Sequence, residues 1–292
     1  MTPGESQHPR PVAEQLRASI DVIRQLKAEV ARYRSRDREP IAIVGASCRI
    51  PGGVETLETY WSLLEDGRDT VREVPASRWD ATALYDPDPA RPGKTYTRHA
   101  AMLEDIAGFD ADFFGISPRE AEAMDPQHRL ALELAWEALE TACIDPRSLR
   151  GSATGVFLGL ASSDYSLPLL GDRQGIDAYV ASGNAHGAAA GRISFLLGLQ
   201  GPSMAVDTAC SSSLTAVHLA VQSLRRGECD LALAGGLNLL LAPELTINFS
   251  KARMLAPDGH CKTFDAAADG FVRGEGGAGS PTHWNGTSRS SP

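Results

Sequence analysis

Residues 201–226 read GPSMAVDTACSSSLTAVHLAVQSLRR, and this stretch decides the fold. The short apolar segment 204–206 predicts a β-strand. Apolar residues then recur at helical spacing and predict an amphipathic helix: Leu214, Val217, Val221 and Leu224. Only small residues around Cys210 separate the end of the strand from the helix. The segment is therefore a strand–turn–helix element with a cysteine at the bend, an arrangement that exposes the nucleophilic serine of hydrolases.

Two features around Cys210 favour a nucleophilic role for this cysteine. The small neighbours Ala209, Ser211 and Ser212 permit a tight turn and leave room for a substrate to approach the sulfur. The start of the following helix places a partial positive charge near the sulfur and stabilises the thiolate. A thiolate that attacks a thioester forms another thioester, so Cys210 is suited to acyl transfer. The alternative, from the residues alone, is a small buried cysteine that fills a tight turn.

A cysteine nucleophile usually has a histidine beside it, and the sequence offers no obvious one. His218 follows eight residues later in the same predicted helix, a rise of about 12 Å, so its ring is out of hydrogen-bonding range. We expect structural roles for His128 and His186 and a surface role for His260. The base for Cys210 is therefore left unassigned.

Strands and helices alternate on both sides of the Cys210 element. Apolar runs predict further strands over 41–44, 155–159 and 231–236, and capping residues or apolar stripes predict helices over 57–65, from Ser117, over 126–142 and over 176–190 with a continuation to 197. Residues 67–105 are rich in Pro, Asp and Arg and predict an irregular surface segment. The alternation predicts an α/β fold, with a sheet covered by helices on both faces.

The N-terminal residues 1–38 predict a separate helix. No Gly or Pro occurs from Val12 to Arg36. Apolar residues recur with spacings of 4, 3, 7 and 3, which match an a/d heptad stripe with Lys27 in one a position: Leu16, Ile20, Ile23, Val30 and Tyr33. About three heptads are short for a lone coiled coil, so the helix needs a partner. It either associates with another chain or lies as an amphipathic helix on its own domain. Residues 35–40 then form a charged hinge.

Composition disfavours several classes of protein. The chain has 292 residues and a formal net charge of −9, whereas a nucleic-acid-binding protein normally has a basic surplus. No apolar run is long enough to span a membrane, and the N-terminus has no signal-peptide core, so we expect a cytoplasmic protein. The five cysteines are odd in number and widely spaced, which argues against a disulfide framework and a structural zinc site.

From about Glu39 to Gly279, the sequence resembles the N-terminal part of a β-ketoacyl synthase, the ketosynthase domain of modular type I polyketide synthases. Four motifs carry the resemblance in the family's order: EPIAIVGASCRIPGGV (39–54), FFGISPREAEAMDPQHRLALELAWEALE (113–140), GPSMAVDTACSSSL (201–214) and GHCKTFDAAADGFVRGEG (259–276). The resemblance implies the N-terminal half of a thiolase-like fold and a homodimer. It also implies that Cys210 is the acyl-accepting nucleophile and that its backbone N–H contributes to the oxyanion hole.

The resemblance further implies a reaction and partners. An acyl carrier protein presents an acyl thioester on its phosphopantetheine arm, and Cys210 takes the acyl group. A malonyl-type extender on a second carrier protein loses carbon dioxide, and the resulting enolate attacks the Cys210 thioester. The chain itself is expected to bind no cofactor, because the carrier protein supplies the arm, and no metal is expected either. The helix in 1–38 resembles the docking segment that receives an upstream polyketide synthase polypeptide.

The sequence departs from the family after Gly279. The family's two catalytic histidines lie in H-G-T-G-T and N-x-G-H motifs, and neither motif occurs here. Residues 280–292 read SPTHWNGTSRSSP, a polar tail unlike the family that we expect not to form a strand. We therefore expect a truncated ketosynthase that is competent for acyl loading at most. The alternative is a non-catalytic docking or scaffold fragment of a polyketide synthase.

Three lesser expectations remain. Asp265, Asp269, Arg273 and Glu275 form either a solvated turn or, by family position, an ion-paired loop at the pocket with Phe264 and Phe271 packed beneath it. A thiolase or a chain-initiating synthase is disfavoured by VDTACSSSL and by FDAAADGFVRGEG. The other four cysteines are expected to be structural: Cys48, Cys143, Cys229 and Cys261.

Overall fold

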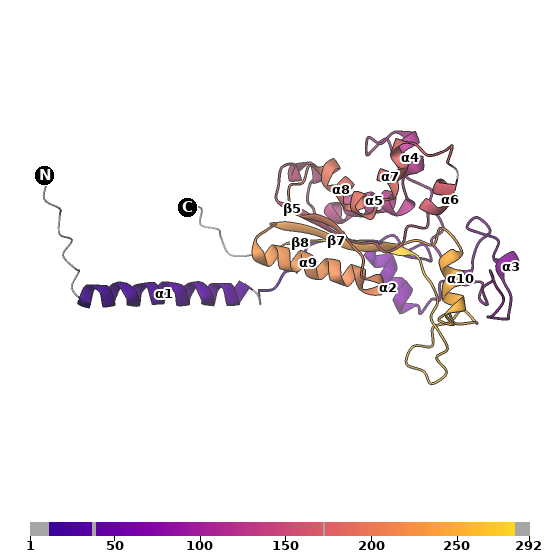
Figure 1. The fold of residues 1–292 in the computed structure, drawn as a ribbon, viewed down its shortest axis with the longest axis horizontal. Coiled ribbons are helices and arrows are strands. Elements are labelled where there is room, and N and C mark those ends of the chain that lie inside the picture. The colour runs from indigo at the N-terminus through magenta and orange to yellow at the C-terminus, as the bar shows by residue number, and fades with distance from the viewer. Residues whose placement is uncertain (1–11, 37–38, 172, 284–292) are drawn as a thin grey trace, which may run out of the picture. The chain divides into compact units, whose positions relative to one another are not determined.

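The computed structural model describes residues 12–36, 39–171 and 173–283 (Figure 1). Two units are distinguished, residues 1–40 and residues 41–292. The first unit contains the helix α1, Val12–Arg36, as the sequence predicts. The side chain of Tyr33 and the hinge residues 37 and 38 lie outside the described part.

The apolar seam of α1 is open to solvent. Ile20 is 41% exposed, Ile23 is 51% exposed and Val30 is 50% exposed. A helix of this length gains little stability in water from its own hydrogen bonds and depends on burying an apolar face. The seam is therefore an apolar stripe that the described residues leave exposed. No helix among the described residues is apolar enough over a sufficient length to cross a bilayer.

The second unit is built on one mixed sheet with the strand order β1-β8-β7-β5-β6, and β2 pairs with β8. Its strands are β1 Ala42–Ile43, β2 Ser47–Arg49, β5 Thr154–Gly159, β6 Ser203–Val206, β7 Leu231–Asn238 and β8 Gly276–His283. β5 runs parallel to both β6 and β7, whereas β8 runs antiparallel to β7, β1 and β2.

Helices cover both faces of this sheet (Figure 1). The longer ones are α2 Leu57–Glu65, α5 Pro126–Thr141, α8 His186–Leu197, α9 Ser212–Arg226 and α10 Glu244–Lys251. Shorter ones are α3 Ala81–Leu84, α4 Pro118–Ala123, α6 Ser166–Gly171, α7 Ala178–Asn184 and the 3₁₀ turns η1 Pro146–Leu149 and η2 Ala209–Ser211. The predicted α/β class is confirmed.

The alternation of side chains along β5 and β7 creates two cores. Val156 and Leu158 of β5 pack with α5 and α8 on one face, together with Leu231 and Leu233 of β7. Phe157 faces the other way and packs against α9. All six residues of β5 are buried, which explains its unbroken apolar sequence.

Two helices begin at the capping residues that the sequence predicts. The Asp125 carboxylate accepts a hydrogen bond from the backbone N–H of Gln127 at 2.8 Å, and α5 follows it. The Ser117 hydroxyl accepts one from the backbone N–H of Glu120 at 3.2 Å at the start of α4. Each contact satisfies one of the backbone donors that a helix start leaves free.

The predicted helix over 176–190 is wrong in its extent. The structure has two helices, α7 and α8, which are separated at Ala185, where the backbone is extended (φ −74°, ψ 125°). The backbone N–H of Asp125 donates to the carbonyl of Gly183 at 2.9 Å, so that carbonyl is taken by another segment. A Cβ at Gly183 would lie 2.4 Å from the carbonyl oxygen of Ala123. This long-range contact, rather than a local signal, interrupts the helix.

Residues 67–105 are more ordered than the sequence predicts. β3 (Val71–Glu73) and β4 (His99–Ala101) pair as a two-stranded antiparallel sheet. Beneath them lies a small core made of Val74, Ala81, Ala100, Met102 and Leu240. The strands are only three residues long and are flanked by Pro, Asp and Arg, so they are too short to show an alternation of apolar residues.

The expectation that the segment after Gly279 cannot form a strand is wrong for residues 280–283. β8 continues through Ser280, Pro281 and Thr282 to His283 and pairs with β7 along its whole length. Proline is tolerated because the neighbouring strand bends there. Residues 44–46 on the β1–β2 side stand opposite residues 280–281, which makes a bulge, and the backbone N–H of Val44 donates to the carbonyl of Pro281 at 3.1 Å. Residues 284–292 lie outside the described part.

A buried histidine in the first turn of α5 makes the stability of this unit depend on pH. His128 is 1% exposed, and neither of its ring nitrogens has a hydrogen-bond partner. Desolvation by burial, helped by the charges of Arg192 and His186, lowers the pKa of His128 from 6.5 to about 4. The unfolded chain therefore binds a proton between these two values that the folded chain does not bind.

We predict that the contribution of neutral His128 to stability is complete above pH 6.5 and is lost as the pH falls to about 4. The loss is roughly 3 kcal/mol at most. Urea denaturation at a series of pH values, compared between the wild type and His128→Gln, measures it. Burial raises the pKa values of Asp125, Glu133 and Asp164, and raised carboxyl pKa values make stability fall as the pH rises. This opposite effect is the same in the wild type and in His128→Gln, so it cancels in the comparison.

The exposed His218 provides the matched control. The His218→Gln variant should keep the pH dependence of the wild type. Parallel stability profiles for the wild type and His128→Gln between pH 6.5 and 4 would contradict the prediction.

Candidate functional site

The strand–turn–helix element around Cys210 is present as predicted. β6 ends at Val206, the turn η2 spans Ala209–Ser211, and α9 starts at Ser212. Ala209 has a φ of 53°, in the left-handed region that residues with a side chain rarely adopt. Such strain concentrates at functional sites, where the surrounding contacts hold it in place.

Polar side chains within the bend hold it together. The Ser212 hydroxyl donates to the carbonyl of Ala209 at 2.6 Å and accepts from the backbone N–H of Thr208 at 2.9 Å. The Ser211 hydroxyl donates to the carbonyl of Thr208 at 2.9 Å, and the Asp207 carboxylate accepts from the backbone N–H of Ala209 at 3.0 Å. The sequence indicated small residues here, but it did not show that their hydroxyls fix the turn.

Cys210 lies on an open surface. It is exposed, and within the described part of the chain no hydrogen bond reaches its sulfur. Two hollows of about 370 and 790 Å³ are lined by residues between 43 and 58, 103 and 108, and 126 and 141, together with Leu239, and not by Cys210. The Cys210 side chain is thus exposed and lies outside both hollows.

The histidines lie where the sequence suggested and do not contact Cys210. His218 is exposed on α9, and His128 is buried in α5. His186 lies with Nε2 3.1 Å from the carbonyl oxygen of Ser162. His260 lies with Nδ1 3.0 Å from the carboxylate of Asp69. Among the described residues, no histidine is therefore placed as a base for this sulfur.

Two buried side chains fix the segments that follow the parallel strands, and neither role was apparent from the sequence. Gln127 donates to the carbonyl of Ser162, after β5, at 3.0 Å and accepts from the backbone N–H of Leu239, after β7, at 3.1 Å. The Glu275 carboxylate accepts backbone N–H groups of Leu103 at 2.8 Å and Leu240 at 2.9 Å. It also pairs with Arg78 at 3.2 Å. In the sequence, the only signals for these two residues are the motif triplets that contain them, DPQ (125–127) and GEG (274–276).

The charged residues after α10 agree in part with the expected ion-paired loop, because Asp269 pairs with Lys262 and Glu275 pairs with Arg78. Arg273 and Glu275 are buried, whereas Lys262 forms exposed ion pairs, each at 2.8 Å, with Asp258 and Asp269. Phe264 is fully exposed, so the expectation that it packs beneath the loop is wrong. Phe271 does pack, edge to face, on Phe249 with ring centroids 5.8 Å apart.

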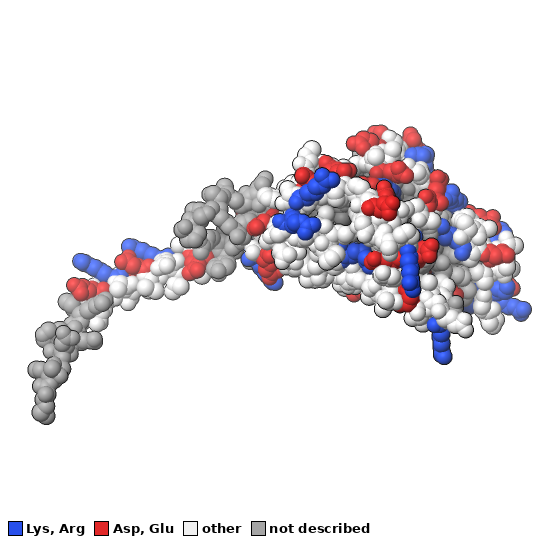
Figure 2. All heavy atoms as spheres, turned by 90° about the horizontal axis from the view of Figure 1, so that it is seen from above, with Lys and Arg blue, Asp and Glu red and all other residues white. Residues whose placement is uncertain are grey.

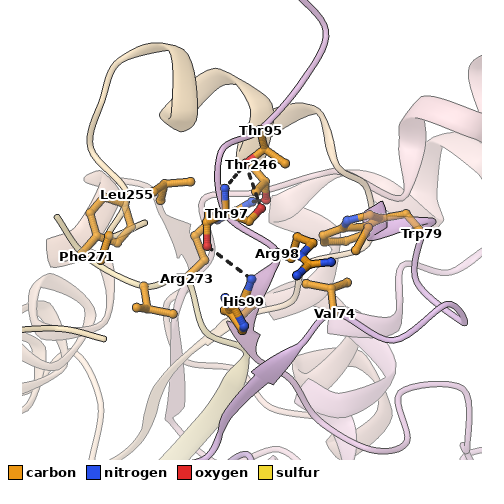
Figure 3. Close-up of a pocket in the computed structure, with 14 residues that line it drawn as sticks. Val74, Trp79, Thr95, Thr97, Arg98, His99, Thr246, Leu255, Phe271 and Arg273 are labelled. Carbon is orange, nitrogen blue, oxygen red and sulfur yellow. Dashed lines mark hydrogen bonds between the residues drawn. The ribbon is translucent and has the colours of Figure 1, made fainter. Parts of the chain in front are cut away.

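A small enclosed cavity lies beside this loop, where residues of the β3–β4 sheet face residues around Phe271 and Arg273 (Figure 3). Its free space is about 10 Å³, which is room for a single water molecule. The cavity is too small for an acyl chain, and Cys210 is not part of its lining. It is therefore a packing feature rather than a substrate site.

Acidic, basic and cysteine side chains are spread over the second unit. In these residues, no group of three or more His, Cys, Asp or Glu side chains is arranged to hold a metal ion. On the face shown in Figure 2, Lys and Arg side chains of the second unit are interspersed with Asp and Glu rather than gathered in a stripe.

The other four cysteines differ in their burial. Cys48 and Cys229 are buried, and burial raises the pKa of both thiols, whereas Cys143 and Cys261 are exposed.

Comparison with known proteins places this site in a family. Residues 38–279 match the family model described as "Beta-ketoacyl synthase, N-terminal domain". The chain is 58% identical over 238 residues to a phenolphthiocerol/phthiocerol polyketide synthase of Mycobacterium tuberculosis, and the match covers 82% of this chain and 13% of that protein. It is 57% identical over 239 residues to polyketide synthase GfsB of Streptomyces halstedii, and the match covers 82% of this chain and 4% of that protein.

Solved structures agree with these relatives. The oxazolomycin ketosynthase domain OzmH of Streptomyces albus superposes with a TM-score of 0.78 at 40% identity, over 83% of this chain and 42% of that one. A ketosynthase from module 6 of the bacillaene synthase of Bacillus subtilis gives 0.75 at 42% identity, over 84% of this chain and 40% of that one. This chain thus spans less than half of the solved ketosynthases and a small part of the polyketide synthases. It belongs to the β-ketoacyl synthase family, and its second unit is the N-terminal, thiolase-like half of a ketosynthase domain of modular type I polyketide synthases.

Proposed function

We propose that Cys210 accepts an acyl chain from the phosphopantetheine thioester of an acyl carrier protein. The observation that carries the proposal is an exposed cysteine at the strained bend between β6 and α9, inside the region that matches the ketosynthase family. The Cys210 thiolate attacks the thioester carbonyl, the carbon–sulfur bond to the arm breaks, and the arm leaves as a thiol with the proton that Cys210 gave up. The backbone N–H of Cys210 would help to hold the negative oxygen of the intermediate.

Loading is the part of the ketosynthase reaction that the residues of this chain support. In the condensation step, a malonyl-type extender loses carbon dioxide and its enolate attacks the acyl group on Cys210. The two histidine motifs that the family uses for this step do not occur among these 292 residues. General acid–base groups contribute roughly 10²–10⁴-fold to a rate. We therefore assign loading, and not condensation, to this chain.

The partners follow from this function and from α1. An acyl carrier protein supplies the arm, so the chain needs no cofactor of its own. The open apolar seam of α1 fits a coiled coil in a homodimer that docks to an upstream polyketide synthase polypeptide. Five free cysteines suit the reducing cytoplasm. The second candidate function is a docking scaffold without chemistry, and the open seam is the observation that favours it.

The first prediction concerns loading. Incubation of the full chain with an acyl N-acetylcysteamine thioester should add the mass of one acyl group, and Cys210→Ala should abolish this gain, because no other sulfur of the described residues lies at a strand–helix bend. Mass spectrometry of the intact protein measures it. Cys143→Ala and Cys261→Ala remove exposed cysteines elsewhere and serve as matched controls that should load normally.

A wild-type chain that gains no acyl mass but binds an upstream polypeptide would favour the scaffold function. Acylation that persists in Cys210→Ala would show that another group is the nucleophile. With a malonyl carrier protein and an acyl-loaded chain, we expect no release of carbon dioxide above background. Robust release would contradict the assignment of loading alone.

The second prediction concerns α1. Ile23 lies in the seam and Val22 beside it, and the two side chains are exposed to a similar degree, 51% and 54%. Ile23→Asp should convert a dimer into a monomer in sedimentation analysis, because it buries a charge in the paired seam, whereas Val22→Asp should remain dimeric. A wild-type monomer, or equal behaviour of the two variants, would contradict a coiled coil through this seam.

A further inference from the structure

The start of α9 rests on two glycines of the sheet. Gly159 ends β5 and Gly236 lies in β7, and the two are direct neighbours in the parallel register. A Cβ atom at Gly159 would lie 2.6 Å from the backbone nitrogen of Ser213 and 2.7 Å from the carbonyl carbon of Ser212. A Cβ atom at Gly236 would lie 2.6 Å from Cβ of Ser213.

These distances leave no room for a methyl group. Carbon atoms that are not bonded to each other pack at about 3.5–4.0 Å. The first turn of α9 therefore sits in a shallow notch that exists only because both neighbouring strand residues lack a side chain. We call this feature the glycine notch, and it consists of Gly159 and Gly236.

The glycine notch is linked to Cys210 through the residues of the bend. Ser212, which lies against Gly159, also ties the bend through its hydroxyl to Thr208 and Ala209. Any displacement of Ser212 is thus passed to Thr208 and Ala209, the two residues that precede the cysteine. A side chain in the notch would therefore displace the first turn of α9, which begins two residues after Cys210.

We propose that Gly159 and Gly236 are positioning residues for Cys210. The proposal rests on the proposed function of Cys210 as the acyl acceptor and adds the device that holds the sulfur in place. The two glycines differ in a testable way. The three atoms nearest to a methyl group at Gly159 are backbone atoms of α9, whereas a methyl group at Gly236 first meets the Cβ atom of Ser213, which a substitution can remove.

The chain also offers a matched control. Gly235 precedes Gly236 in β7, and a Cβ atom there would lie 2.4 Å from the carbonyl oxygen of Ala278 in β8. Gly235→Ala is therefore at least as crowded, but against the neighbouring strand rather than against α9. It separates a general loss of stability from a displacement of the cysteine.

The experiment compares the full-length wild type with Gly159→Ala, Gly236→Ala, Gly235→Ala, Ser213→Gly and the double variant Gly236→Ala/Ser213→Gly. Three quantities are measured: the free energy of unfolding in urea, the rate of acyl loading from an acyl N-acetylcysteamine thioester, and the rate at which iodoacetamide alkylates Cys210. Both rates are expressed per folded molecule.

We expect loading to fall about tenfold or more in Gly159→Ala and Gly236→Ala, since a misplacement of about 1 Å can cost about 100-fold. Ser213→Gly should restore loading to Gly236→Ala, because it removes the atom that the new methyl group meets. Gly235→Ala should lose stability and still load at the wild-type rate per folded molecule. If Gly159→Ala does not fold, the comparison of Gly236→Ala with Gly236→Ala/Ser213→Gly still tests the proposal.

Wild-type loading rates in Gly236→Ala, a similar loss in Gly235→Ala, or no restoration by Ser213→Gly would overturn the proposal. Failure of the proposed function looks different. In that case the wild type reacts with iodoacetamide at Cys210 but takes up no acyl group, and the alkylation rates of the same variants still report whether the notch positions the sulfur.

Discussion

The parallel pairing of β5 with β6 on one side and β7 on the other is the interaction on which the second unit depends. β5 is buried over its whole length and contributes to the cores on both faces of the sheet. Its register brings the ends of three strands to one edge, where the bend after β6 begins. The location of Cys210 is therefore a consequence of strand register more than of contacts made by the cysteine itself.

The parts of this fold that the sequence predicted are those with strong local signals. The bounds of α2 agree with the prediction, and α5 ends one residue before its predicted end, because a capping residue or a run of helical spacing marks each. The bend at Cys210 was predictable because a strand signal, four small residues and a helix signal follow one another without a gap. Each of these signals lies within about two turns of the residues that it controls.

The remainder depends on contacts between distant segments. The break at Ala185 requires the N–H group of Asp125, and the burial of Glu275 requires backbone donors from Leu103 and Leu240. β8 contains a proline and several glycines, so its own residues argue against a strand, and it forms because both of its sides are paired. No short stretch of the sequence predicts these contacts, because each one joins residues that are far apart in the chain. The same is true of Gly159 and Gly236, which matter because the first turn of α9 packs directly against them.

The position of β8 has a consequence for how the protein is made. β8 comes last among the described strands in sequence but lies inside the sheet, and His283 stands opposite both Ala42 and Leu231. On the ribosome, the first strands must remain without partners until nearly the whole unit has been translated and has left the exit tunnel. Pairing between such remote segments is slow, and open strand edges invite association with other nascent chains. A chaperone that covers the unpaired strand edges would therefore protect the nascent chain from the synthesis of its first strand until β8 is available.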